Sequence, residues 1–274
     1  MLNRIIKIGG GKVGKILILE LKKILRKKKI LIMLELLLAG LFIFSAYKIM
    51  VMSQKSNDSE AYYNEIRNIQ NNEQIHDQVS PVEEIPYKKV LKDLKVRNED
   101  VLGWIKIDET KVDYPFAAGI DNAYYLSHLI DKTENEYGSI FLDMRNSSDF
   151  SDRHTVLYGH NALNGTMFGS LKKYNDDAYL KEHPFITIHQ ENQTLVYEIF
   201  GAGEIKVTSD IYKFEFINDD AFTEFTQALC TQLNVEAELD SEDQILTLST
   251  CTDFNDSKRF IVCARLIEVK SNNN

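Results

Sequence analysis

One long apolar stretch stands out near the start of the chain. Residues 30–52 are mostly apolar, and Glu35 and Lys48 are the charged residues among them. About 20 apolar residues in a helix span the hydrocarbon core of a bilayer. Both charges lie toward an end of the stretch, from which they reach the headgroups. The pattern predicts a single transmembrane helix.

The residues that flank this stretch predict its orientation. Lysines and arginines crowd residues 22–29, whereas the residues after position 52 are mostly polar. The positive-inside rule then makes residues 1–29 a basic cytoplasmic tail and places the body outside the cell. No clear small-residue cleavage motif follows, which favours an uncleaved signal anchor over a signal peptide. A buried core helix is the alternative, but the length and the lysine block argue against it.

The next residues are polar and then become helical again. Residues 53–80 are rich in Asn, Gln, Glu and Ser, with apolar residues at roughly helical spacing. We expect a stalk or linker here that is partly helical. Pro81 and Pro86 end it, and a second helical pattern covers residues 87–96. The folded extracytoplasmic domain is expected to occupy residues 81–274.

From residue 103 onward the hydrophobic pattern is mostly that of β-strands, interrupted by two helical patterns at 178–182 and 219–232. Short strands at regular spacing, separated by turn residues, are typical of a sandwich or a barrel. The fold class is therefore mostly β with flanking helices. The strands are expected at 103–107, 111–117, 139–143, 154–160, 185–190, 195–207, 244–251 and 260–269.

The charge is divided unevenly along the chain. Residues 1–52 hold 11 Lys/Arg and 2 Asp/Glu, so the remaining residues hold 21 Lys/Arg and 39 Asp/Glu of the total. A basic head on an acidic body excludes nucleic acid as the expected partner of the body. It suits a chain whose two parts lie on different sides of a membrane.

Three cysteines, Cys230, Cys251 and Cys263, are too few for a disulfide framework. Their spacing fits no metal motif, and a zinc site would need further ligands, so no metal site is expected. Cys230 and Cys263 have apolar neighbours and are interpreted as small buried side chains. An odd cysteine in an exported chain indicates a free thiol, and Cys251 is the candidate.

Cys251 ends the predicted strand 244–251. Alternate residues of a strand face the same side, so Thr247, Ser249 and Cys251 share one face, opposite the leucines that form the natural core face. Cys251 then lies where a rigid strand opens into a polar loop, which is where scaffolds present reactive groups. Ser249 is an alternative nucleophile, but a cysteine is intrinsically the better one.

Arg259 and His160 are the expected companions of Cys251. Arg259 starts the strand that follows the loop, and consecutive strands commonly pair, which returns Arg259 to Cys251. A guanidinium there favours a thiolate and offers planar donors to a developing oxyanion. His160 closes another strand, and a cysteine with a distant histidine is typical of acyl-transferring cysteine enzymes. The residues alone leave open whether His160 meets Cys251.

These segments resemble the sortases. TLSTC at 247–251 with Arg259 resembles their active-site strand pair, and LYGHN at 157–161 with MFGSL at 167–171 resembles their histidine segment. The STC triplet, the helix before the first strand and the helical insertion before the cysteine strand are most similar to class B. The resemblance covers roughly residues 82–270, and three motifs in this order are highly specific.

The resemblance implies a closed eight-stranded β-barrel, preceded by N-terminal helices, on the outer face of a Gram-positive membrane. It makes Cys251 the nucleophile, His160 the acid and base, and Arg259 the third catalytic residue. The candidate substrate-binding residues are Ser249, Thr250 and Asn161. No cofactor is implied.

The partners implied are secreted proteins with a C-terminal sorting signal and an amine of a peptidoglycan cross-bridge or a pilin lysine. Class B members are associated with haem-acquisition proteins or with pilus anchoring.

Two rival functions remain. One is another cysteine peptidase or transpeptidase that acts on peptidoglycan itself; L,D-transpeptidases place a histidine just before the cysteine, whereas Thr250 stands there in this chain. The other is a catalytically idle, membrane-tethered binding module. Loss of the cysteine, histidine or arginine would have indicated it, and all three are present.

Overall fold

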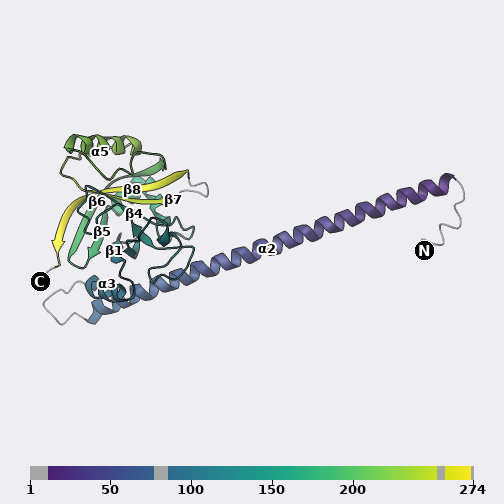
Figure 1. Ribbon diagram of the computed structural model, residues 1–274, viewed down its shortest axis with the longest axis horizontal. Coiled ribbons are helices and arrows are strands. Elements are labelled where there is room, and N and C mark those ends of the chain that lie inside the picture. Colours follow the sequence, from purple (N-terminus) through teal and green to yellow (C-terminus); the bar gives the residue numbers. More distant parts are fainter. Residues whose placement is uncertain (1–11, 77–85, 252–256, 273–274) are drawn as a thin grey trace. The chain divides into compact units, whose positions relative to one another are not determined.

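The structure, a computed structural model, describes residues 12–76, 86–251 and 257–272. The chain divides into two compact units, of which the first ends at Gln54 and the second begins at Lys55. Figure 1 shows the elements of each unit. Residues 1–11 of the expected cytoplasmic tail, 77–80 of the expected stalk and 81–85 of the expected folded domain lie outside the described residues.

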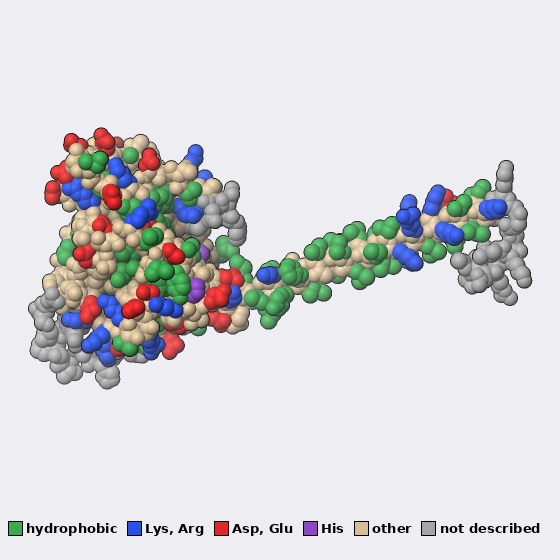
Figure 2. All heavy atoms as spheres, viewed as in Figure 1, with side chains coloured by type: hydrophobic (Ala, Val, Ile, Leu, Met, Phe, Trp, Pro, Cys, Tyr) green, Lys and Arg blue, Asp and Glu red, His purple; other side chains and the backbone are tan. Residues whose placement is uncertain are grey.

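The first unit contains the start of helix α2 (Lys12–His76). Large hydrophobic side chains between residues 30 and 52 are exposed all along this helix, and Figure 2 shows them on the face in view, next to a group of lysines and arginines. A helix that is apolar all round is not a surface helix of a soluble domain. Within the described part of the chain it is the one helix long and apolar enough to cross a membrane, so it could serve as the expected anchor.

The later turns of α2 belong to the second unit and pack against its core. Tyr63 and Ile66 are 1% and 6% exposed, and the side chain of Arg67 donates to the backbone carbonyl of Asp113 at 2.9 Å. The apolar positions are three to four residues apart, so they form one face that the barrel covers. This part of the expected stalk is therefore a packed helix, and the compact unit begins at Lys55 instead of residue 81.

Eight strands close into a barrel in the order β1-β2-β3-β4-β7-β8-β6-β5. The β2–β3 and β4–β7 pairs are parallel and the other pairs are antiparallel. Every strand expected from the sequence is present, and the closed barrel is confirmed. The strands are β1 (Val101–Lys106), β2 (Asp113–Ala117), β3 (Ile140–Leu142), β4 (His154–Tyr158), β5 (Phe185–Gln190), β6 (Gln193–Lys206), β7 (Ile245–Cys251) and β8 (Lys258–Ser271).

The helices of the second unit lie around this barrel, with α3 and α5 on opposite sides of it (Figure 1). Helix α5 begins where the Asn218 side chain accepts from the Ala221 amide, and it ends at Asn234 with a left-handed φ of 54°. Both are standard helix-ending devices. Two short 3₁₀ helices, η1 and η2, were not predicted. The elements are α3 (Pro86–Arg97), η1 (Tyr124–Leu126), η2 (Gly169–Asn175), α4 (Asp177–Glu182) and α5 (Asp219–Leu233).

Two apolar cores lie on the two faces of the β7–β8 pair. The inner core fills the barrel and includes Leu246 and Leu248. The outer core packs α5 against the other face through Ile261 and Cys263. Burial on both faces leaves the predicted polar face of β7 covered as well, with Ser249 1% exposed. The insertion before β7 is the cause, because α5 and the residues that lead into it lie over this face.

Candidate active site

The end of β7 carries the predicted nucleophile. Cys251 is the last residue of the strand, and its backbone pairs with that of Arg259 in β8. The same antiparallel register pairs Ser249 with Ile261 and Thr250 with Phe260. The expected return of Arg259 beside Cys251 is thus present in the backbone. The loop between them, residues 252–256, lies outside the described residues.

Arg259 lies at the start of β8, where β6 flanks it on the other side. Its backbone pairs with that of Ile205, and its Nη1 donates to the Lys258 carbonyl at 2.9 Å. The side chain is half-buried. A guanidinium is a planar group with five N–H donors, the type of group that can hydrogen-bond a carbonyl oxygen.

His160 follows β4, which pairs with β7 in parallel. Tyr158 is the register partner of Ser249, and the Gly159 amide donates to the Ser249 carbonyl at 3.2 Å. His160 comes two residues after Tyr158, as Cys251 comes two residues after Ser249. The backbones of His160, Cys251 and Arg259 therefore lie at one end of three neighbouring strands, β4, β7 and β8. Pattern reasoning could not supply this because parallel pairing across 91 residues leaves no local signal.

The ring of His160 has a defined hydrogen bond. Its Nε2 lies 2.6 Å from the carbonyl oxygen of Leu126 in η1. A carbonyl only accepts, so Nε2 carries a hydrogen and donates it. In the neutral ring the lone pair is then on Nδ1, which makes Nδ1 the atom able to take up or release a catalytic proton. The backbone oxygen acts as the orienting group that a catalytic histidine needs.

Gly159 allows this segment to fold tightly. A Cβ at Gly159 would lie 2.8 Å from the ring of Phe168, well inside van der Waals contact. Phe168 is fully buried, and its amide donates to the His160 carbonyl at 3.0 Å. The glycine before His160 therefore lets the MFGSL segment pack directly on the end of β4.

The predicted substrate-binding residues occupy different environments. Ser249 lies on the outer face of β7, and its Oγ is 2.8 Å from the Tyr212 hydroxyl. Thr250 is 2% exposed, and its hydroxyl has no hydrogen-bond partner among the described residues. Asn161 forms an isolated β-bridge with Met167. All three adjoin the strand ends, and their contact with substrate stays a prediction.

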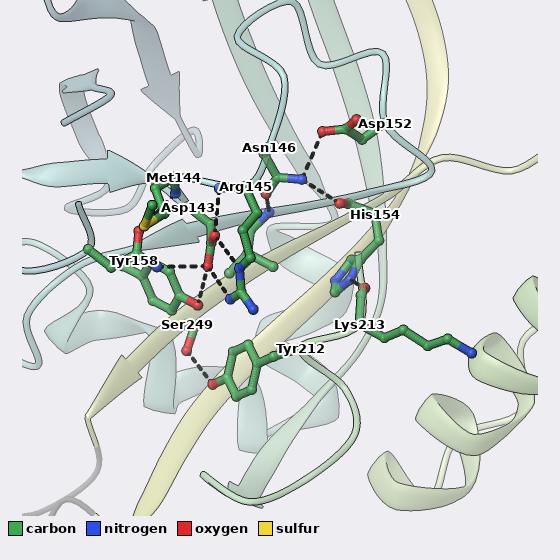
Figure 3. A network of polar contacts seen from close by, with 12 residues as sticks. Asp143, Met144, Arg145, Asn146, Asp152, His154, Tyr158, Tyr212, Lys213 and Ser249 are labelled. Carbon is green, nitrogen blue, oxygen red and sulfur yellow. Dashed lines mark hydrogen bonds and ion pairs between the residues drawn. The ribbon is translucent and has the colours of Figure 1, made fainter. Parts of the chain in front are cut away.

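A polar network beside the site was missed by sequence reasoning (Figure 3). The buried carboxylate of Asp143 accepts from Arg145 Nε at 2.8 Å and Nη2 at 2.7 Å, from the Tyr158 hydroxyl at 2.9 Å and from Asn122 at 3.1 Å. Burial alone would raise the pKa of this carboxyl, but the hydrogen bonds from Arg145 and Tyr158 outweigh it and lower the pKa. Asp143 is thus held as a carboxylate. A DxR pair after a strand is too common a pattern to have indicated this.

His154 belongs to the same region but is unlike His160. It is fully buried, its Nδ1 contacts the Lys213 carbonyl at 2.8 Å, and its Nε2 contacts Thr247 Oγ1 at 2.9 Å. Burial lowers the pKa of His154 to about 4. The ring is therefore neutral at physiological pH and has a structural role.

The other two cysteines are not placed for catalysis. Cys263 is fully buried in the outer core, and burial raises the pKa of its thiol to about 12. Cys230 lies on α5, and burial also raises its pKa. Both thiols thus stay protonated and unreactive at neutral pH. Within the described ranges, no group of three His, Cys, Asp or Glu side chains is placed to hold a metal ion.

A hollow of about 380 Å³ opens elsewhere on the barrel and is lined by residues that include Leu102, Gln190 and Gln193. These residues start β1, end β5 and start β6. They lie at the end of the barrel away from Cys251, because β7 and β4 end at the other one. The hollow therefore contains none of the predicted site residues.

The family comparison matches this geometry. The sortase domain family matches residues 105–267, which include all of the strands except parts of β1 and β8. The chain belongs to the sortase family. It is accordingly an enzyme of the cysteine transpeptidase class, which confirms the resemblance seen in the TLSTC and LYGHN segments. The two rival functions lose their support.

Curated relatives place this sortase near class B. It is 30% identical to sortase B of Listeria monocytogenes over 240 residues, covering 85% of this chain and 95% of the relative. It is 27% identical to sortase B of Staphylococcus aureus over 255 residues, covering 89% and 100%.

Solved structures agree with this assignment. The Staphylococcus aureus sortase B–substrate complex matches with a TM-score of 0.70 at 25% identity, covering 78% of this chain and 99% of that one. Sortase B of Bacillus anthracis matches with a TM-score of 0.68 at 29% identity, covering 78% and 99%. The expected similarity to class B sortases is confirmed.

Proposed function

We propose that this sortase cleaves a C-terminal sorting signal through a thioester on Cys251 and transfers the acyl group to an amine at the cell surface. The observation that carries the proposal is the backbone register of β4, β7 and β8. This register brings the backbones of a cysteine, a histidine and an arginine to one end of neighbouring strands, and these residue types can serve as nucleophile, acid and base, and oxyanion donor in acyl transfer.

The first half of the reaction acylates the enzyme. The Cys251 thiolate attacks a backbone carbonyl carbon of the signal, and Arg259 donates to the oxygen as negative charge develops on it. The C–N bond then breaks, and the imidazolium of His160 gives the leaving nitrogen its proton. The products are a thioester on Cys251, neutral His160 and a peptide with a free amine.

The second half returns the enzyme to its starting state. An acceptor amine attacks the thioester carbon while His160 takes its proton at Nδ1, the nitrogen that is free of the Leu126 carbonyl. The C–S bond breaks and the thiolate leaves, so a new amide forms with no net change in protonation. Two moderate barriers replace one large barrier for amide exchange.

The acceptor is proposed to be a primary amine of a peptidoglycan cross-bridge, with a pilin lysine as the alternative. One solved sortase B, with a TM-score of 0.68 at 27% identity, is complexed with triglycine. That peptide carries a free α-amine, which supports a peptide amine as acceptor. Ser249, Thr250 and Asn161 are proposed to contact the sorting signal of the secreted protein.

We also propose that residues 30–52 are a single-pass anchor with the N-terminus in the cytoplasm. The exposed apolar side chains of this segment and the preceding basic residues support it. Protease added to intact cells should then degrade the second unit and spare the first. Full protection of the second unit would exclude this topology.

A peptide panel tests the function. Quenched fluorescent peptides with NPQTN-like, LPxTG-like and SPxTG-like signals are incubated with the full chain in detergent, with triglycine as acceptor. Cleavage of one member with formation of the triglycine adduct, both lost in Cys251→Ala, is the expected result. Cleavage that persists in Cys251→Ala would reject the assignment of the nucleophile.

A further inference from the structure

The residues between β6 and α5 cover the outer face of the barrel, and residues 212–216 among them form no strand that pairs with the sheet. Residues 212–216 have no regular secondary structure. An irregular segment of this kind is positioned by side-chain contacts or not at all. Residues 211–214, called here the covering segment, make such contacts at three successive positions.

The first contact joins the covering segment to the strand of the nucleophile. The Tyr212 hydroxyl lies 2.8 Å from Ser249 Oγ, and its ring stacks on that of Tyr158 with centroids 6.2 Å apart. Ser249 precedes Cys251 by two residues in β7. Tyr212 therefore lies against β7 two residues before the proposed nucleophile, and its position depends on what holds the segment.

The second contact fixes the backbone of the next residue. His154 in β4 contacts the Lys213 carbonyl at 2.8 Å with Nδ1, and Thr247 Oγ1 at 2.9 Å with Nε2. The carbonyl accepts, so Nδ1 carries the hydrogen. The ring thereby ties the covering segment to both β4 and β7.

The third contact is a cation over an aromatic ring. The Arg145 guanidinium carbon lies 3.8 Å from the centroid of the Phe214 ring. Asp143 holds this guanidinium through Nε and Nη2 at once, and the Asp143 side chain is 0% exposed. A bidentate pair fixes the plane of the guanidinium as well as its place. Figure 3 shows Asp143, Arg145 and Tyr158 lying together, with Tyr212 next to Ser249.

We propose that Asp143 and Arg145 are positioning residues that hold the covering segment through Phe214 and so fix Tyr212 beside Ser249 as a wall of the binding site for the sorting signal. The pair acts on binding of the acyl donor and does not touch the reacting atoms. The role of the wall rests on the proposed function, whereas the anchoring of the segment does not.

The test changes each partner of the Arg145–Phe214 contact in turn, in the full chain in detergent. Arg145→Gln removes the cation, Phe214→Leu removes the ring face and keeps an apolar side chain, and the double variant reports coupling. Phe214→Trp keeps a ring face and is the rescue variant. Arg153→Gln is the matched control, because it removes a second arginine from an aromatic ring, that of Phe222 at 5.3 Å, and Arg153 pairs with Asp219; neither partner belongs to the covering segment.

Hydrogen exchange of residues 211–217 decides whether the pair holds the segment. Faster exchange is expected in Arg145→Gln and Phe214→Leu, with no further increase in the double variant. Near wild-type exchange is expected in Phe214→Trp and Arg153→Gln. Unchanged exchange in the first two variants would overturn the proposal, and this readout does not depend on any activity.

Kinetics decide whether the segment is a wall of the site. KM for the sorting peptide is expected to rise on the order of tenfold in Arg145→Gln and Phe214→Leu, while kcat and the alkylation rate of Cys251 stay near wild type. If kcat instead falls in proportion to thermal stability across all the variants, Arg153→Gln included, Asp143 and Arg145 would have only a structural role. If wild type processes no peptide while exchange responds as expected, the proposed function fails and the anchoring of the segment stands.

Discussion

Tyr63 tests whether the end of α2 is part of the folded enzyme. Its side chain is 1% exposed, and its ring meets that of Tyr114 edge-on with centroids 5.1 Å apart. Ser139 Oγ donates to the His128 carbonyl at 2.9 Å, which uses its hydrogen. The single hydrogen of the Tyr63 hydroxyl therefore points to two acceptors, Ser139 Oγ at 2.9 Å and the Gly138 carbonyl at 3.3 Å.

Two substitutions separate the hydroxyl from the ring. Tyr63→Phe removes one buried hydrogen bond and should lower the free energy of unfolding by about 1 kcal/mol. Tyr63→Ala also removes the ring from the core and should lower it by about 3–5 kcal/mol. For a domain of this size the melting temperature should fall by roughly 2–4 °C per kcal/mol.

The assay is thermal and urea unfolding of the full chain in a mild detergent, followed by tryptophan fluorescence. Trp104 is a suitable probe because it is fully buried in the barrel. Tyr62→Phe and Tyr62→Ala are the matched controls, since Tyr62 is adjacent and only partly buried. If Tyr63→Ala were no more destabilising than Tyr62→Ala, residues 55–69 would be a stalk after all, and the packing argument would be refuted.

Three further predictions address the site. Arg259→Lys keeps a positive charge but loses the planar fork, so kcat/KM for the sorting peptide should fall on the order of 100-fold or more; a wild-type value would give Arg259 a structural role. Tyr212→Phe and Ser249→Ala should couple by about 1 kcal/mol in a double-mutant cycle of urea unfolding, and additive effects would contradict the 2.8 Å contact. The pKa of His154 is lowered to about 4 in the folded state, whereas a histidine in the unfolded chain has its ordinary pKa of about 6.5. Below pH 6.5 the unfolded state therefore binds more protons than the folded state. The free energy of unfolding should fall by about 2 kcal/mol from pH 7.5 to pH 5 through this residue. His154→Gln should show a shallower fall over that pH range, and an equal slope would refute this.

Local patterns predicted the elements well because each element satisfies its own rule. The alternation of residues 244–251 is that of a strand with an apolar inner face, and β7 (Ile245–Cys251) is shorter than this range by one residue. Helix α5 has an asparagine at each end, and its observed range differs from the expected one by a single residue. The motifs around Cys251 and His160 also identified the family before any geometry was considered.

Which strands pair with each other, and which segments cover the barrel, could not be predicted in the same way. Nothing in the periodicity of β4 indicates that it lies parallel to β7, because hydrophobic alternation does not encode the partner of a strand. The face of Ser249 looked open, since its cover comes from residues 211–214, which have no periodic pattern. The end of α2 looked like a stalk because most of its positions are polar, although Tyr63 and Ile66 belong to the hydrophobic core.

The Asp143–Arg145 pair shows the same limit for side chains. Asp143 immediately follows β3, and the sequence gives no sign that its carboxylate is buried. Arg145 is only two residues away, but the other two donors, Asn122 and Tyr158, come from other parts of the chain. Such a network becomes visible only when the strands that carry it are in register.

The most direct test of the account is the mass of the enzyme during turnover. The full chain is mixed, without acceptor amine, with a sorting peptide that it has been shown to cleave. The reaction is quenched in acid within seconds, and the mass of the protein is measured intact and after digestion. A thioester mechanism predicts a mass increase equal to the N-terminal acyl fragment, located on Cys251, removed by added triglycine and absent in Cys251→Ala. Peptide cleavage without this adduct, or an adduct on Cys230 or Cys263, would contradict it.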